Sequence, residues 1–328
     1  MTALMAGLGL AAAACTGTPG TGTTAASPAG SPTTVAVAST TGSTRSVTTS
    51  APASATAGSS TAELTMGAVH QLPAGVAPGL SGLAPGPTAD TFYAVDDKVG
   101  TSQVVVIRPD GSVAGEIDVS GMSARNAEAL GAAPCGSRHC LYIADIGDNA
   151  AAREDVVIYR LTDPAVGRTA EPAVWRYTYP DGPHNAEAFF PLTDGTLVIV
   201  TKPARRKDGT VAPHRVYRGK PGGGELTSVT TFSPPEPRRP LQSLLVGNVV
   251  TDAAYDGKRV LLLTYDQVIE YRAPTPDADP ATFPRWPHTA LPDPPMIQTE
   301  AIAVTDCGYL VGSEEGPGGT RSAVTQVC

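Results

Sequence analysis

The sequence Arg125-Asn126-Ala127-Glu128-Ala129-Leu130, followed after a loop by Leu141-Tyr142-Ile143-Ala144-Asp145-Ile146-Gly147-Asp148-Asn149, is a pattern that this chain repeats. Each full copy has a small residue, a carboxylate, an alanine and an apolar residue, then a short loop and an apolar run with a polar end. Further copies begin at Asn185, Thr251 and Thr299, and a weaker copy without a carboxylate begins at Ser81. We call this pattern the carboxylate box.

A second repeat follows in phase, because a short apolar run ending in arginine comes after each of the first four boxes. These arginines are separated by 52, 58 and 54 residues: Arg108, Arg160, Arg218 and Arg272. Periods near 50 with several short strands are typical of β-propellers. We therefore predict an all-β propeller of five blades, or six if 241–250 supplies another blade. A lone strand near Leu64–Leu72 is expected to close the ring by joining the last blade.

Composition changes sharply near Glu63 and divides the chain into three parts. Residues 16–63 are almost entirely Thr, Ser, Ala, Gly and Pro, which predicts a disordered linker because they cannot bury enough apolar surface. Residues 64–328 form the predicted propeller domain. The formal net charge is −8, which argues against nucleic acid and against an anionic membrane surface as electrostatic partners of the domain.

Residues 1–15 look like an export signal. Their apolar run is too short to span a bilayer, and small residues directly before the lone Cys15 resemble a bacterial lipobox. That resemblance implies cleavage before Cys15 and acylation of its thiol, hence a lipid-anchored protein facing the extracellular side. The alternative is an ordinary signal peptide in which Cys15 has no role.

The other four cysteines predict two disulfides in an oxidising compartment. Cys135 and Cys140 flank a small loop before a strand, and Cys307 precedes the last inner strand while Cys328 ends the chain. We expect pairing within each of these two sets, although two other pairings remain formally possible. A cysteine-bound metal is the less favoured alternative, because no Cys-x-x-Cys pair occurs.

The box carboxylates are the first candidates for a site. In a propeller the same position of each blade recurs around the axis, so Glu128, Glu187, Asp252 and Glu300 can form a ring. Converging carboxylates repel one another unless a cation or a basic group lies among them, and oxygen ligands suit Ca²⁺. The alternative, which we expect to be commoner, is that each carboxylate accepts backbone N–H groups of the next blade.

Three further groups of residues carry polar side chains that could belong to a site. Asp145, Asp148 and Asn149 form the densest polar cluster, which suits a tight turn and can also present oxygens to a cation. His184 lies near Glu187 and is a weak candidate for general acid–base catalysis with it, the alternative being a solvent-facing loop residue. Residues 202–207 are basic and are expected to be a solvated loop.

The boxes make residues 80–328 resemble secreted bacterial propellers that carry a Glu-Ala or Glu-Gly box in each blade. The wider group includes phytase-like and esterase-like propellers, some of which hold Ca²⁺ with channel carboxylates, and Glu128, Glu187 and Glu300 match those positions. This chain departs from the pattern with Asp252 in place of Glu, and the basic phosphate-binding residues of phytases have no counterpart. The tether and signal resemble those of high-GC Gram-positive bacteria.

Together these features predict a cell-surface lipoprotein whose propeller binds a protein, glycan or small ligand, with Ca²⁺ as the candidate cofactor. Binding without catalysis is the favoured role. The alternative is a secreted Ca²⁺-dependent hydrolase, of phosphoesterase or esterase type, that uses the channel carboxylates.

Overall fold

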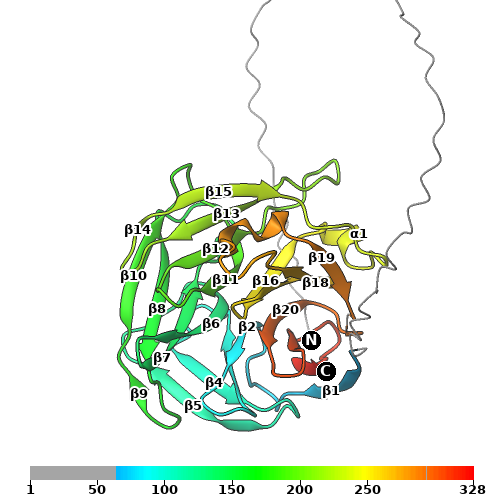
Figure 1. The fold of residues 1–328 in the computed structure, drawn as a ribbon. Coiled ribbons are helices and arrows are strands. Elements are labelled where there is room, and N and C mark those ends of the chain that lie inside the picture. Colours follow the sequence, from blue (N-terminus) through cyan, green and yellow to red (C-terminus); the bar gives the residue numbers. More distant parts are fainter. Residues whose placement is uncertain (1–63, 293) are drawn as a thin grey trace, which may run out of the picture. The chain divides into compact units, whose positions relative to one another are not determined.

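Each box lies on the innermost strand of a blade in this computed structural model, which describes residues 64–292 and 294–328. The box is thus a strand of its own, and it pairs with the apolar run that follows it in the sequence. The five box strands pack against one another in sequence around the ring, and the last, β20, packs against the first, β2 (Figure 1). They are β2 (Leu80–Pro85), β6 (Ala127–Cys135), β11 (Ala186–Pro191), β16 (Val250–Tyr255) and β20 (Thr299–Val304).

Three more strands complete each blade, so the predicted all-β propeller is confirmed and the described part has five blades. Blade one adds β3 (Phe92–Asp96), β4 (Gln103–Ile107) and β5 (Val113–Val119). Blade two adds β7 (Arg138–Asp145), β8 (Val156–Thr162) and β10 (Ala173–Thr178). Blade three adds β12 (Leu197–Thr201), β13 (His214–Gly219) and β15 (Thr227–Phe232). Blade four adds β17 (Arg259–Thr264), β18 (Gln267–Arg272) and β19 (His288–Leu291).

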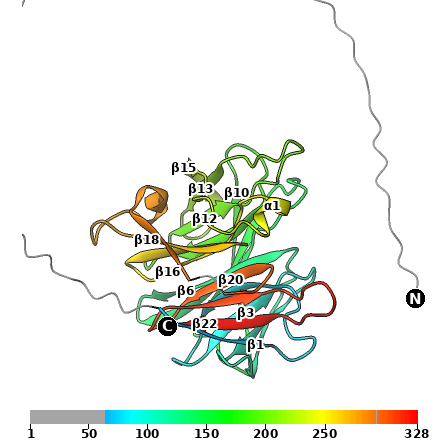
Figure 2. The ribbon, with the colours of Figure 1, turned by 90° about the vertical axis from the view of Figure 1, so that its right-hand side faces the viewer.

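Blade five combines strands from both ends of the described chain. Its sheet order is β1 (Met66–Gln71), β22 (Ala323–Val327), β21 (Tyr309–Ser313) and β20, and β1 runs antiparallel to β22 (Figure 2). Two short strands, β9 (Thr169–Ala170) and β14 (Gly224–Glu225), pair in parallel with the outer strands of blades one and two. They cover two sheet edges that would otherwise expose unpaired backbone groups.

The segment considered for a sixth blade is a connection between blades three and four. It contains the four-residue helix α1 (Ser243–Val246). The connection between β18 and β19 contains the 3₁₀-helix η1 (Pro280–Arg285). No helix in the described ranges is both long and apolar enough to cross a membrane. The predicted leader at residues 1–15, with Cys15, and the predicted linker at residues 16–63 lie outside those ranges.

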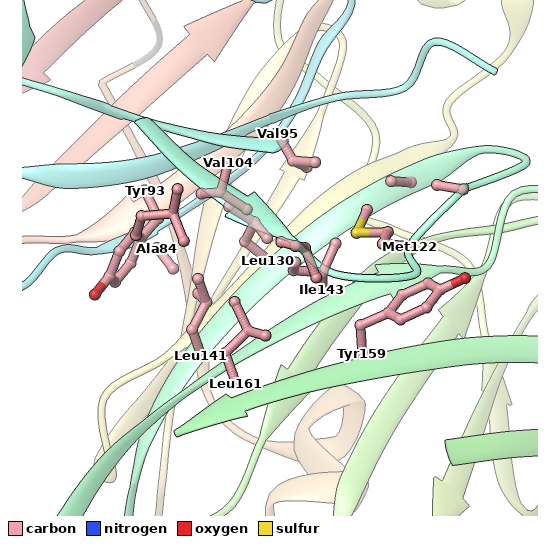
Figure 3. Packing of buried hydrophobic residues seen from close by; sticks show 14 of the residues in the cluster. Ala84, Tyr93, Val95, Val104, Met122, Leu130, Leu141, Ile143, Tyr159 and Leu161 are labelled. Atoms are coloured by element: carbon pink, nitrogen blue, oxygen red, sulfur yellow. The ribbon is translucent and has the colours of Figure 1, made fainter. Parts of the chain in front are cut away.

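The hydrophobic core lies between the faces of adjacent blades, which is why the strands read as almost unbroken apolar runs. Between blades one and two, Val104 and Tyr93 pack with Leu130, Leu141 and Ile143 (Figure 3). Comparable buried clusters fill the other interfaces around the ring. Packing between blade faces therefore helps to hold the innermost strands in place.

Small residues occupy the innermost strands because the blades converge there. A Cβ atom added to Gly82 would lie 2.6 Å from the backbone nitrogen of Leu130 in the next blade, closer than real contacts allow. The alanines of the box occupy the corresponding positions of other blades. The repeated Glu-Ala pattern therefore reflects close backbone approach as well as chemistry.

Both predicted disulfides are confirmed. Cys135–Cys140 joins the hairpin of β6 and β7, and Cys307–Cys328 ties the end of the chain to the turn before β21. In the chain-entropy model, closing the second loop is worth about 3 kcal/mol.

Candidate functional site

One residue near the start of each box strand is bulged out of its pairing with the next strand. In blade two, Ala127 lies opposite Asp145 and Ala129 opposite Ala144, which leaves Glu128 without a partner of its own. A β-bulge re-aims a side chain, and here the same irregularity recurs in all five blades. The bulged residues are Ser81, Glu128, Glu187, Thr251 and Glu300, and all are buried.

Three of these bulged side chains bring their carboxylates together. One oxygen each from Glu128, Glu187 and Glu300 lies within 4.8 Å of the others, and all three residues are at most 7% exposed. Oxygens this close together can contact one ion after small side-chain adjustments, because Ca²⁺–oxygen bonds are ~2.4 Å long. We call these residues the glutamate triad.

A second set of side chains reaches the same end of the channel. Because β-strands in a blade are antiparallel, the residue after the second strand lies beside the start of the box strand. That position is held by Asp97, Ile146, Lys202, Tyr265 and Glu314. Asp97 and Tyr265 were not among the site residues predicted from the sequence.

Lys202 is the cation of the triad. Its ammonium contacts the Glu187 carboxylate, lies 2.8 Å from the Tyr265 hydroxyl and 3.5 Å from Glu300 Oε1, and its side chain is 15% exposed. The prediction of a solvated loop was wrong for Lys202 and right for Arg205, Arg206 and Lys207, which are exposed. The signal that could have separated them is position, since Lys202 directly follows a buried strand.

Hydrogen bonds from side chains hold the triad carboxylates. The amide of Asn126 donates to Glu128 Oε1, and the amide of Asn185 donates to Glu187 Oε1 at 3.3 Å. In both blades the asparagine stands two residues before the glutamate, and this repeat is the signal in the sequence that identifies both donors. The Tyr265 hydroxyl donates to Glu300.

Burial and mutual repulsion raise the pKa values of these carboxyls. Burial, followed by the charges of Glu187 and Glu300, holds the pKa of Glu128 well above its usual range. Burial raises the pKa of Glu187 to about 7, although Lys202 opposes the shift. Burial and the charge of Glu300 raise the pKa of Glu314 to about 9, and burial raises that of Asp97 to about 6.

The ionised triad carries more negative charge than its partner can neutralise. Burial lowers the pKa of Lys202, but the charges of Glu187 and Glu300 outweigh burial and raise it well above its usual range, so the ammonium stays charged. Three carboxylates and one ammonium leave two negative charges in a buried place. Either protons or a divalent cation must balance them.

Asp252 does not join the triad, because the register of blade four is offset by one residue. Val250 pairs with Thr264 and Asp252 with Leu263, so Thr251 is the bulged residue and Asp252 occupies the place of an alanine. Its carboxylate accepts the backbone N–H of Ala253 at 2.7 Å and of Ile302 in blade five at 2.8 Å. This is the blade-to-blade role that the sequence analysis gave as the alternative.

The cluster from Asp145 to Asn149 uses its oxygens within the protein. Asp145 accepts the backbone N–H groups of Arg125 and Asn126 and forms a buried ion pair with Arg153 at 2.8 Å. Asp148 accepts the backbone N–H of Arg153, and Asn149 accepts from the amide of Asn185. The cluster therefore borders the triad through Asn185 and contributes no carboxylate to it.

His184 contacts Asp181 rather than Glu187. Its Nε2 lies 3.1 Å from Asp181 Oδ1, and its ring packs edge-on against Tyr179 with centroids 5.1 Å apart. The place at Glu187 that the sequence analysis considered for His184 is taken by Lys202.

The two ends of the channel differ in chemistry. Beside the triad, a cavity of about 420 Å³ is lined by Asn149, His184, Asn185, Lys202, Arg215 and Tyr265, among others. At the opposite end the box strands leave a cavity of only about 40 Å³, with walls that include Leu83, Leu130 and Pro191. Polar groups that can bind a ligand are thus concentrated at the triad end.

Comparison with known proteins yields only distant likenesses of fold. No protein-family model and no curated protein matches the sequence. The structure is similar to a PQQ-bound aldose sugar dehydrogenase from Streptomyces coelicolor (11% identity, 81% of this chain and 99% of that one, TM-score 0.42). It is also similar to a gluconolactonase from Xanthomonas campestris (15% identity, 79% and 95%, TM-score 0.38). Similarity at this level carries nothing about chemistry.

Proposed function

We propose that this chain is an exported, lipid-anchored propeller that binds a polar ligand at the triad end of its channel, with a divalent cation such as Ca²⁺ held by the triad. The observation that carries the proposal is the convergence of three buried glutamates from three blades around one ammonium. Three ionised carboxylates and one ammonium leave two negative charges, which one Ca²⁺ ion would neutralise.

The triad residues suit such an ion in their chemistry. Ca²⁺ takes six to eight oxygen ligands, and carboxylates are preferred among them. Glu128, Glu187 and Glu300 would supply carboxylate oxygens, with other ligands left to water or to the bound molecule. Asn126 and Asn185 keep two of the carboxylates oriented, which lowers the cost of organising the site.

The adjacent cavity supports a ligand of small-molecule or oligosaccharide size. Its volume of about 420 Å³ lies in the range of ordinary ligand pockets. The amides of Asn149 and Asn185, the Tyr265 hydroxyl and the Lys202 ammonium can all hydrogen-bond hydroxyl groups. A glycan segment is therefore the ligand that this lining fits best.

Thermal unfolding tests the cation. We expect the melting temperature of the wild-type chain to rise when millimolar Ca²⁺ replaces EDTA, because ligands that bind the folded state stabilise it. The double variant Glu128→Gln/Glu300→Gln should lose that rise, whereas Glu116→Gln, an exposed carboxylate on β5, should keep it. An equal response in the first two proteins would exclude the triad as the site.

The anchor has its own test, because Cys15 and the leader lie outside the described residues. Detergent phase partitioning of cells that express the full chain should place the protein in the detergent phase. The Cys15→Ala variant should move to the aqueous phase. Equal partitioning of both would remove the anchor and leave the cation site unaffected.

A hydrolase is the second candidate, and the titration of Glu187 favours it. A carboxyl with a pKa of about 7 beside an ammonium and a cavity can exchange protons near neutral pH. Ester and phosphoester substrates should then be turned over, and Glu187→Gln should abolish turnover. Absence of turnover by the Ca²⁺-loaded wild-type protein would leave binding as the function.

A further inference from the structure

The connection that carries α1 exposes apolar side chains with no role in the core. Leu241, Leu244 and Leu245 are 75%, 67% and 78% exposed, and Val246 is 43% exposed. No residue of α1 is buried, although three of its four residues are leucine or valine. Figures 1 and 2 draw the helix outside the sheets. These residues are therefore not explained by folding.

The segment is nevertheless held in place at its base. The Asp266 carboxylate accepts the backbone N–H groups of Gln242 and Ser243 at 2.9 and 2.6 Å. The Gln242 amide donates to the Tyr265 carbonyl at 2.7 Å and accepts from the backbone of Gln298 at 2.7 Å. The leucines thus project from a fixed platform, and their exposure is built into the structure.

Basic residues surround this apolar turn on a protein that is acidic as a whole. Arg238 and Arg239 directly precede it, and the hairpin with Arg205, Arg206 and Lys207 lies against it: a Cβ on Gly247 would meet Val211 at 2.4 Å and Arg205 at 3.6 Å. All five basic side chains are exposed, and within the described ranges none of them forms an ion pair. Asp208 and Glu236 are the acidic residues nearest in sequence, and Asp266 lies at the base of the turn, so five basic residues against three acidic ones leave a positive excess.

We propose that this surface, formed by residues 238–246 and the hairpin 205–211, inserts into the interface of an anionic lipid bilayer. Exposed leucines flanked by arginine and lysine are the composition of interfacial membrane-binding segments. A projecting apolar turn needs a deformable partner, and a bilayer interface accepts it without a matching groove. The basic residues match the negative charge of anionic headgroups. The net charge of −8 argued against an anionic membrane as a partner. That value describes the whole chain, whereas this surface is locally positive.

The surface also sets how the propeller would stand on the membrane. Val246 and Arg205 line the same cavity as Lys202 and Tyr265, so the inserted turn would lie beside the ligand site. The proposal depends neither on the cation nor on acylation of Cys15, and it is tested without either.

Vesicle sedimentation of the full chain carrying Cys15→Ser tests the proposal. Binding to vesicles of phosphatidylcholine with phosphatidylglycerol should exceed binding to phosphatidylcholine alone, and added salt should weaken it. Leu241→Ser/Leu244→Ser/Leu245→Ser should reduce binding about tenfold or more. Arg238→Gln/Arg239→Gln should reduce it roughly twenty-fivefold, since each basic residue near an anionic surface contributes about fivefold.

The matched control is Val99→Ser, which alters an equally exposed side chain (79%) in blade one and should bind like the parent. The leader is common to all these proteins, so differences among them report the surface alone. Equal binding to both vesicle types, or undiminished binding by the leucine variant, would overturn the proposal. Failure of the parent to bind anionic vesicles would also overturn the membrane proposal. A protein partner would then be the remaining explanation for the exposed leucines. The Ca²⁺-induced melting shift should persist in every variant.

Discussion

Glu187 in blade three and Asp252 in blade four are buried carboxylates of neighbouring innermost strands, yet they do different things. Glu187 lies on a bulge and meets Glu128, Glu300 and Lys202 at the channel. Asp252 lies one register position later and satisfies two backbone N–H groups between blades. The same box can therefore give a ligand group or a structural tie, and the position of the bulge decides which.

The largest effect is expected where the triad loses its cation. Lys202→Met should lower the free energy of unfolding by about 3–5 kcal/mol near neutral pH, because it leaves buried carboxylates unpaired. Urea denaturation measures the change. Lys207→Met, on the exposed part of the same loop, should change stability by less than about 0.5 kcal/mol. Similar values for both variants would mean that Lys202 is not the counter-charge.

The structural carboxylate should give the next largest effect. Asp252→Ala leaves two buried N–H groups without acceptors and should cost about 2–4 kcal/mol in urea denaturation. Calcium affinity of the folded variant should be unchanged, because Asp252 is not part of the triad. If Asp252→Ala had normal stability but no longer responded to Ca²⁺, Asp252 would be a cation ligand and not a structural tie.

Glu128 should behave in the opposite way to Asp252. Glu128→Gln replaces a carboxyl whose ionisation burial and neighbouring charges already disfavour, so stability in EDTA should stay the same or rise by about 1 kcal/mol. In Ca²⁺ the variant should gain less stability than the wild type. A large loss of stability in EDTA would show that Glu128, too, has a mainly structural role.

The dependence of stability on pH without metal tests the same buried carboxyls as a group. The folded-state pKa values of Glu187 and Glu314, about 7 and about 9, exceed their ordinary values, so the folded state binds protons more tightly than the unfolded state. Their contribution to stability is complete below the ordinary pKa and is lost as pH rises through the folded-state values. The melting temperature in EDTA should therefore fall between about pH 5 and pH 9, and Ca²⁺ should flatten that fall. A melting temperature that rises between about pH 5 and pH 9 would contradict the raised pKa values of these carboxyls.

Much of the fold could be predicted because its determinants repeat. The arginine spacing and the boxes gave the propeller, and the cysteine positions gave both disulfides. The blade number stayed open because residues 233–249 are long enough to hold one or two more strands but form a connection. Three glutamates of the site were found for the same reason, since they recur in phase.

The missed features depend on geometry that a repeat in sequence does not record. A bulge shifts one residue relative to the partner strand, so Thr251 rather than Asp252 aligns with the glutamates. Lys202 looked like the start of a basic loop, and only the antiparallel pairing places it among the carboxylates. Both errors come from comparing residues along the chain when the channel brings them together across strands.

Isothermal titration with Ca²⁺ tests the central claim most directly, that three buried glutamates and one lysine make a site for one divalent cation. The wild-type chain should bind a single ion, and Glu128→Gln/Glu300→Gln should bind none under the same conditions. Asp252→Asn should bind like the wild type. An unchanged titration of the double glutamine variant, or no binding by the wild type at millimolar Ca²⁺, would contradict the account.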